Sequence, residues 1–319
     1  MTKDEVLKLL KNSGGEYVSG EKISRELNIT RTAVWKAINS LRSEGFTISS
    51  ATNKGYRLAV EGVHLSRAAL SARKKTVIGG ELHFFESVTS TFDKLAEFEP
   101  KEGLTVIAAQ QTSGRGRLGR NWDSGRGGVY FSFMLLPPID ADTAPFITLI
   151  CALAVQRALS EYADCKIKWP NDIVCGGRKL CGILTKTSLT ENEVENVCVG
   201  IGINVNNGGF GGELANATSL KEICGHEIDE NKLFERVAAE LDRAYYRESR
   251  ADVLSDYKMV CANLGKHITV HYANGKRDIP GVCTDILPDG SMNVDTENGT
   301  INVNSGEVSV KGIYEFERK

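Results

Sequence analysis

The sequence predicts an α+β protein of three parts: helices ending in a hairpin, a central mixed sheet with helices, and a small β-barrel. Three observations indicate this order. Apolar residues recur at helical spacing up to residue 43, strand and helix patterns mix irregularly between residues 81 and 204, and apolar residues alternate with polar ones after Gly265. With 319 residues, the chain corresponds to about two domains of ordinary size. We expect domain boundaries after residues 62 and 263.

The N-terminal part, residues 1–62, shows three helical patterns followed by two strand patterns. The helices are expected at 4–11, from the N-cap Ser19 to Leu27 and from the N-cap Thr30 to Ser43, and the strands at 46–50 and 56–60. Helix, helix, turn, helix and hairpin in this order are typical of a winged helix-turn-helix.

The third of these helices carries the residues that we expect at DNA. Its outward face presents Arg31, Thr32 and Lys36 to the major groove, and Lys54 on the hairpin reaches a phosphate. Trp35 is expected to pack at the edge of the small core. Residues 1–60 carry a net charge of +4 in a chain whose net charge is -2, so the basic excess lies in this part. Because this excess is modest, we expect tight binding to need a dimer on two-fold symmetric operator DNA.

The central part, residues 63–263, mixes strands and helices without the regular crossover helices of a doubly wound sheet, which favours an α+β fold with a mixed sheet. The strands are expected at 82–86, 104–109, 129–136, 166–168, 179–186 and 194–200, and the helices at 91–99, 143–162 and 229–246. In the last part, residues 264–319, turn signals recur every 9–15 residues between alternating segments. This pattern predicts a barrel of about five strands, SH3-like in size.

The composition excludes several classes of protein. No stretch reaches the roughly 18 apolar residues that a membrane-spanning helix needs, and the amphipathic start lacks a signal-peptide core, so we expect a cytoplasmic protein. The eight cysteines form no CxxC pair, and no pair of histidines lies near them. We therefore expect reduced thiols and no metal site.

The strongest functional signal is the loop at residues 110–122, with the sequence QQTSGRGRLGRNW, in a chain unusually rich in glycine (32 residues). Glycine lets backbone N–H groups approach an anion, and arginine offers paired donors to a phosphate or a carboxylate. The pattern GxGxxG is present, but a dinucleotide-binding fold also needs a helix that opens within it, and a P-loop needs Gly-Lys-Ser/Thr. Neither is found here. The competing interpretation is a solvated basic surface loop.

Three further segments favour a single ligand pocket. They are KWPNDI at 168–173, RKLCGIL at 178–184 and GIGINVN at 200–206. Each alone is equally well explained as a turn or a close contact within a sheet. Glycine weakens a strand unless something must approach its backbone, so Gly200 and Gly202 are expected to let a ligand lie against the strand.

In this order and spacing, the Gly-Arg loop, the KWPND segment and the KLCGIL segment are similar to those of the biotin–protein ligase family. With its helix-turn-helix and barrel, the whole chain resembles the bifunctional bacterial form, which also represses the biotin biosynthetic operon. The resemblance implies that ATP, with Mg2+, activates biotin as biotinyl-5′-AMP. Biotin then passes to a lysine of the biotin carboxyl carrier domain of acetyl-CoA carboxylase. It also implies that the adenylate promotes a homodimer on operator DNA.

The resemblance further implies roles for individual residues. Lys179, Arg115 and Arg117 would be catalytic. The residues that would bind biotin are Ser90, Thr91, Phe92, Gln110, Arg115, Gly116, Arg117 and Lys179. Those that would bind ATP and the adenylate are Arg117, Arg120, Trp122, Lys168, Asn171, Asp172 and Asn204, with Asn171 and Asp172 on the nucleotide or metal side.

Two positions depart from the family pattern. Phe92 stands where asparagine often follows the Ser-Thr pair, and Leu118 stands where the loop often has another arginine. The missing cation is expected to weaken adenylate retention or loop folding without abolishing activity. Two other functions stay open: a transcription factor that only senses a small molecule, and a lipoate–protein ligase, which shares the catalytic fold.

Overall fold

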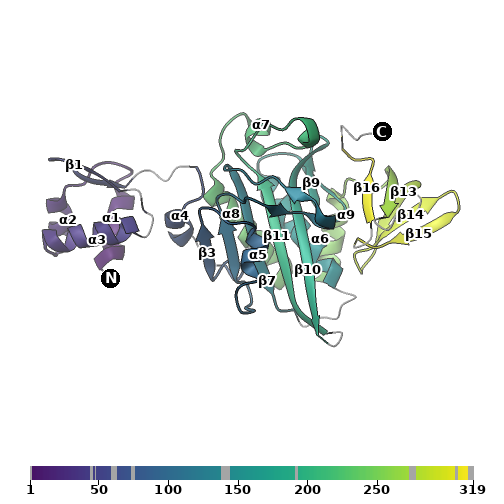
Figure 1. Cartoon of the computed structure of the whole chain (residues 1–319), viewed down its shortest axis with the longest axis horizontal. Coiled ribbons are helices and arrows are strands. Elements are labelled where there is room, and N and C mark those ends of the chain that lie inside the picture. Colours follow the sequence, from purple (N-terminus) through teal and green to yellow (C-terminus); the bar gives the residue numbers. More distant parts are fainter. Residues whose placement is uncertain are drawn as a thin grey trace. The chain divides into compact units, whose positions relative to one another are not determined.

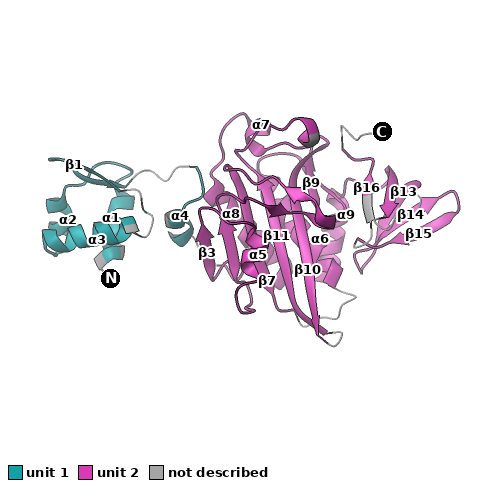
Figure 2. Cartoon of the chain, in the orientation of Figure 1, with its two compact units in different colours: residues 1–73 teal, residues 74–319 magenta. Residues whose placement is uncertain are grey.

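A computed structural model describes residues 2–43, 46, 48–58, 63–72, 76–137, 144–190, 193–272, 278–305 and 308–314. The chain divides into two compact units, Met1–Arg73 and Lys74–Lys319 (Figure 2). The boundary expected after residue 62 lies outside the described residues, and the boundary expected after residue 263 lies within the second unit. The C-terminal strands therefore belong to the same compact unit as the central sheet.

The first unit consists of helices and a hairpin in the expected order, followed by one further helix that was not expected (Figure 1). Its elements are α1 (Thr2–Asn12), α2 (Gly20–Glu26), α3 (Arg31–Ser43), β1 (Ile48–Ala51), β2 (Gly55–Leu58) and α4 (Arg67–Ala72). The Ser19 hydroxyl caps α2 by accepting from the backbone N–H of Lys22 (3.1 Å). Val6, Ile23 and Ile38 are fully buried in one core that also includes hairpin residues, which confirms the winged helix-turn-helix.

Two details of this unit differ from the prediction. Trp35 is 55% exposed, so it does not pack at the edge of the core. Val34 and Ile38 fill the inner face of α3, and Trp35 falls outside that face of the helix. The strands of the hairpin are also shorter than expected, and the expected strand residues 47, 59 and 60 lie outside the described part of the chain.

A seven-stranded mixed sheet forms the centre of the second unit. Its strands are β3 (Leu82–Phe85), β4 (Thr105–Ala108), β7 (Gly128–Leu135), β8 (Cys165–Lys168), β9 (Asp172–Cys175), β10 (Arg178–Thr190) and β11 (Glu193–Asn204). Their order is β3-β4-β7-β11-β10-β9-β8; β3 and β4 are parallel and the other neighbours antiparallel. The predicted mixed sheet is thus confirmed, with β9 as an additional strand because the KWPND segment had indicated only a turn.

The helices of this unit are α5 (Thr91–Leu95), α6 (Ala144–Leu159), α7 (Leu220–Cys224), α8 (Glu230–Tyr246) and α9 (Arg250–Val260). α6 is buried along nearly its whole length because it packs against both α8 and the sheet. The long helices expected at 143–162 and 229–246 are therefore present, although residue 143 lies outside the described part. The helix expected at 91–99 already ends at Leu95, and α7 and α9 were not expected.

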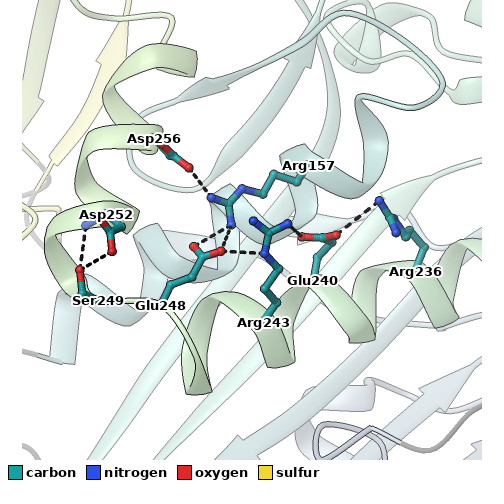
Figure 3. A network of polar contacts seen from close by, with 8 residues as sticks. All are labelled: Arg157, Arg236, Glu240, Arg243, Glu248, Ser249, Asp252 and Asp256. Carbon is teal, nitrogen blue, oxygen red and sulfur yellow. Dashed lines mark hydrogen bonds and ion pairs between the residues drawn. The ribbon is translucent and has the colours of Figure 1, made fainter.

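A polar network connects α6, α8 and α9 (Figure 3). Arg157 on α6 contacts Glu248 (2.8 Å) and Asp256 (2.5 Å), and Arg243 on α8 contacts the same Glu248 (2.8 Å). Burial lowers the pKa of Arg157, but the two carboxylates raise it by more, so the net shift is upward. Because Arg157 and Glu248 are only 16% and 15% exposed, water and salt screen this pair less than an exposed one.

The C-terminal part forms a five-stranded antiparallel sheet, which agrees with the strand number expected for a small barrel. Its strands are β12 (His267–Tyr272), β13 (Ile279–Ile286), β14 (Met292–Thr296), β15 (Gly299–Val303) and β16 (Val308–Lys311). Their order is β15-β14-β13-β12-β16. The Trp169 indole N–H donates to the carbonyl of Gly290 (3.1 Å), so these strands are anchored to the turn between β8 and β9.

Candidate active site

A cavity opens over the sheet between the Gly-Arg loop, the start of α5 and the turn that joins β8 to β9. Most of the residues that the sequence predicted for the site line it: Ser90, Thr91, Phe92, Arg115, Gly116, Arg117, Arg120, Trp122, Lys168, Asn171, Asp172 and Lys179. Chain segments more than eighty residues apart thus meet at one place. Two predicted residues, Gln110 and Asn204, are not part of the lining.

Gln111, rather than Gln110, faces the cavity. Its side-chain oxygen accepts from the backbone N–H and the hydroxyl of Thr91 (2.7 and 3.0 Å), and its amide nitrogen donates to Ser124 (2.8 Å). Successive side chains of an extended segment point to opposite sides, so only one of two adjacent glutamines can face the cavity. The chain direction after β4 decides which one, and the sequence does not reveal it.

Asn204 lies at the far end of β11. It shares the strand face of Gly200 and Gly202, but it is two residues further along. Its side-chain oxygen accepts from the amide of Asn207 (3.0 Å), and the side chain is buried. The Asn204 side chain therefore stabilises the turn that follows β11.

Ser90 and Thr91 are placed by the start of α5. The Ser90 hydroxyl accepts from the backbone N–H of Phe92 (3.2 Å), and the Thr91 hydroxyl forms a hydrogen bond with that of Ser132 (2.8 Å). Both Ser90 and Thr91 are almost fully buried, so their hydroxyls are fixed before any ligand arrives. Hydroxyl groups fixed in this way can orient a polar ligand in the cavity.

The strands β9 and β10 bring together the charged groups of the cavity. Lys179, near the start of β10, contacts the Asp172 carboxylate (2.7 Å), and the Tyr314 hydroxyl donates to its second oxygen (2.5 Å). Burial raises the pKa of Asp172, but Lys179 and Lys168 outweigh this effect with the Tyr314 hydrogen bond and hold that pKa below its usual value. Asp172 is therefore a carboxylate at neutral pH and holds Lys179 at the cavity wall.

The Gly-Arg loop is built from β5 (Gly114–Arg115), a 3-10 turn (Arg117–Gly119) and β6 (Asn121–Trp122). Arg117 donates to the Asn171 side chain (2.7 Å) and to the Ser305 carbonyl, so it connects the loop with two other parts of the site. Burial lowers the pKa of Arg117, but an arginine so shifted is still charged at neutral pH. Arg115, which is largely exposed, pairs with Asp93 (2.8 Å).

The sequence predicted that the strand glycines let a ligand lie against the strand; in the structure, aromatic side chains of the protein itself lie against them. A Cβ on Gly202 would lie 2.4 Å from the Trp122 Nε1 atom, and one on Gly200 would lie 2.9 Å from the Phe92 ring. The Trp122 Nε1 atom is buried and has no hydrogen-bond partner among the described residues. The Lys179 ammonium lies 5.2 Å from the Trp122 ring centroid. The Trp122 ring, the Lys179 ammonium and the backbone of β11 thus lie next to one another at the cavity.

In chemical terms, the cavity can hold two anions close together. Its charged lining consists of five cations (Arg115, Arg117, Arg120, Lys168 and Lys179) and one carboxylate, Asp172. Such an excess of positive charge offsets the repulsion between a carboxylate and a phosphate and stabilises the charge that develops when they react. Among the described residues, no cluster of three or more His, Cys, Asp or Glu side chains could hold a metal ion.

Comparison with known proteins agrees with this chemistry. Residues 84–204 match the biotin/lipoate A/B protein ligase family, and residues 2–57 match a helix-turn-helix domain. The bifunctional ligase/repressor BirA of Bacillus subtilis is 34% identical over 320 residues, which cover 96% of this chain and 98% of that protein. The chain belongs to the bifunctional biotin–protein ligase/repressor family. Its Escherichia coli member, also a bifunctional ligase/repressor, is 27% identical over 96% of both chains.

Solved structures of biotin–protein ligases share the fold of the second unit. The Aquifex aeolicus enzyme in complex with biotin and ATP matches with a TM-score of 0.64 and 31% identity, over 72% of this chain and 98% of that one. The α+β class with its mixed sheet is therefore shared with ligases of the family.

The sequence assigned no individual role to several residues that line the cavity: Gln111, Asn121, Ser132, Trp169, Pro170, Ile183, Leu184, Ile201 and Val310. Most of them stand in the segments that the sequence predicted to form the pocket; Ser132 and Val310 lie outside those segments. Ser132 and Leu184 both pair with Gly200 and therefore share its face of the sheet, but this register is set by the pairing of three strands and no single segment contains it. Val310, in contrast, comes from β16, and no local pattern connects that strand with the site.

None of the helices that the structure describes has the length and apolarity to span a membrane.

Proposed function

We propose that this chain is an ATP-dependent biotin–protein ligase and that it also represses transcription when its reaction intermediate is bound. The observation that carries the ligase proposal is the cation-rich cavity around the Lys179–Asp172 pair (2.7 Å). Membership of the family and its likeness to a ligase bound to biotin and ATP support the same activity. In the proposed organisation, residues 1–62 bind DNA, residues 63–263 carry the chemistry and residues 264–319 complete the cavity.

The reaction has two steps. The biotin carboxylate attacks the α-phosphorus of ATP, a new C–O–P linkage forms, and the bond to pyrophosphate breaks. The lysine amine of the carrier domain then attacks the acyl carbon, an amide forms, and AMP leaves. Lys179 offsets the charge of the two approaching anions, and Arg115 and Arg117 stabilise the phosphate oxygens.

The remaining residues bind and orient the substrates. Ser90, Thr91, Phe92 and Gly116 contact biotin, with Gln111 in the place first assigned to Gln110. The nucleotide lies against Trp122, within reach of Arg120, Lys168 and Asn171. Asp172 acts by holding Lys179. The resemblance implied these roles, apart from those of Gln111 and Asp172, and the lining of the cavity and its contacts support them.

Mg2+ enters this reaction with its substrate, as MgATP. The cavity offers one carboxylate, Asp172, and both of its oxygens already have partners, Lys179 and Tyr314. Mg2+ commonly binds substrate phosphates together with only one or two carboxylates. The protein therefore does not need a resident metal site for this chemistry.

The proposed partners are the biotin carboxyl carrier domain of acetyl-CoA carboxylase, operator DNA and a second copy of this chain. Arg31, Thr32, Lys36 and Lys54 are all exposed on the first unit, where they could meet a duplex. Arg31 already contacts Glu21 (2.8 Å), so DNA would have to compete with this exposed pair. The adenylate would serve both as intermediate and as corepressor.

One assay separates this proposal from its two competitors. The protein is incubated with ATP, a carrier domain, and either biotin or lipoate, and the mass of the carrier is measured. We expect a mass gain with biotin only. A gain with lipoate would identify a lipoate–protein ligase, and the absence of any gain, with biotin still bound, would identify a sensor without ligase activity.

A further inference from the structure

The C-terminal strands reach into the cavity of the second unit. Val310 on β16 is part of its lining, and the Ser305 carbonyl accepts from Arg117 of the Gly-Arg loop. Tyr314, just after β16, touches two charged residues of the β8–β9 turn region. The cavity is therefore completed by residues that follow the central sheet by more than a hundred positions.

Tyr314 makes two different contacts with the charged groups. Its hydroxyl donates to one oxygen of Asp172 (2.5 Å), and the Lys168 ammonium lies 3.7 Å from the centroid of its ring. Asp172 and Lys168 are 9% and 8% exposed, so both charges are held away from water. Hydrogen bonds to a carboxylate and cation–π contacts are both stronger in such surroundings.

The Asp172 carboxylate is shared between two partners. One oxygen accepts from Tyr314 and the other contacts Lys179 (2.7 Å). The Tyr314 hydroxyl thus fixes the rotation of the carboxylate, and the rotation of the carboxylate fixes where the Lys179 ammonium lies. The ring of Tyr314 makes a second contact, with the Lys168 ammonium, that does not pass through the Asp172 carboxylate.

We propose that Tyr314 is a positioning residue for adenylate formation, through which the C-terminal strands orient Asp172 with Lys179 and, separately, Lys168. This inference rests on the proposed ligase function and adds a residue outside the Gly-Arg loop and the KWPND and KLCGIL segments. When a catalytic group is displaced by about 1 Å, the rate of the chemical step can fall by a large factor. The loss of one orienting contact should therefore lower mainly kcat.

Two substitutions separate the two contacts. Tyr314→Phe removes the hydroxyl and keeps the ring over Lys168, and we expect pyrophosphate release from biotin and ATP to slow about tenfold, with the KM for ATP little changed. Tyr314→Leu also removes the ring, and we expect the KM for ATP to rise in addition. The Kd for biotin should stay close to that of the wild type in both, since Tyr314 contacts neither Ser90 nor Thr91.

A combined variant tests whether Tyr314 acts through Asp172. In single-turnover measurements, Tyr314→Phe should have almost no further effect in an Asp172→Ala background, because the carboxylate that accepts the Tyr314 hydrogen bond is no longer there. A double variant whose rate is slowed by the product of the two single effects would overturn the proposal. So would a wild-type rate for Tyr314→Phe alone.

The control is Tyr246→Phe. Tyr246 also donates its hydroxyl to a carboxylate, that of Glu102, but neither residue lines the cavity. This variant should keep the wild-type kcat and KM, and thermal unfolding of all variants checks that they fold. If the wild-type protein released no pyrophosphate, the proposed ligase function would be refuted. If the wild type were active and Tyr314→Phe equally active, only the role of Tyr314 would be refuted.

Discussion

Lys179 is held by a buried carboxylate, and that contact determines what its removal should do. Its side chain is 29% exposed and reaches both Asp172 and the face of Trp122. The ammonium group can therefore contact a ligand in the cavity without a change in the position of its side chain. Its anchor, Asp172, stays ionised because neighbouring cations lower its pKa.

We expect Lys179→Ala to slow pyrophosphate release from biotin and ATP by a factor on the order of 10²–10³, the usual cost of losing one group that stabilises developing charge. The protein should remain folded because the side chain is partly exposed. Lys221→Ala is the matched control, since Lys221 forms an exposed pair with Glu227 (3.0 Å). Release at the wild-type rate in Lys179→Ala would contradict the role assigned to this lysine.

Arg117 should matter more for keeping the intermediate than for forming it. It is fixed by Asn171 and Ser305, so it offers a preoriented cation within the loop. We expect Arg117→Gly to raise the dissociation rate of biotinyl-5′-AMP about tenfold or more, measured by chase with unlabelled ligand. Arg126→Gly removes an arginine that forms an exposed pair with Glu86 (2.9 Å), and this variant should dissociate at the wild-type rate.

Most residues that the sequence predicted for the site line the cavity, among them the lysines, the arginines and the Ser-Thr pair. Their short segments made them recognisable in the sequence, although Gln110 and Asn204 stand in such segments too and do not line the cavity. Gln111 and Tyr314 were missed for two different reasons. For Gln111, the side that a residue faces after a strand depends on the local twist of the chain. For Tyr314, the position depends on tertiary packing. Neither leaves a pattern in the local sequence.

Among the strands, β11 shows how an element is shaped by what lies against it. Gly200 and Gly202 alternate with Ile201 and Ile203, so one face of the strand has no side chains at the position of the cavity. Trp122 fills this space, and its ring lies too close to Gly202 to leave room for even one methyl group.

We therefore expect Gly202→Ala to displace Trp122 and to destabilise the protein by roughly 1–3 kcal/mol, the usual cost of overpacking. The affinity for ATP should fall with it, because the nucleotide is proposed to lie on Trp122. Thermal unfolding and ATP titration measure the two effects. Gly208→Ala is the control, since its Cβ would meet nothing closer than 3.7 Å and should change neither quantity.

Helices and strands were predicted best where one period runs for many residues. α6 and α8 follow from long apolar patterns, whereas α9 was missed because only Val253 and Tyr257 of its eleven residues are buried. β9 was missed because it begins immediately after a proline turn. Short elements depend on the strands and helices that cover them, and a local pattern does not contain that information.

In the chain as a whole, DNA binding and catalysis are proposed to share one ligand. If the adenylate stabilises a dimer, it must also strengthen binding to a two-fold symmetric duplex, and DNA must in turn strengthen binding of the adenylate, because the two equilibria are linked. The first unit contributes a modest positive charge, so one copy alone should bind weakly.

We expect operator-length duplexes, selected from a random library in the presence of biotin and ATP, to be shifted in a mobility assay only when both substrates are added. Lys36→Ala should weaken this shift and reduce its dependence on salt, because Lys36 is an exposed cation on α3. Lys221→Ala, in the second unit, should not. A shift that is equal with and without the substrates would show that the helix-turn-helix binds DNA without control by the adenylate. Since the ligand would then bind the free and the DNA-bound chain equally well, its role as corepressor would be refuted while the ligase activity would stand.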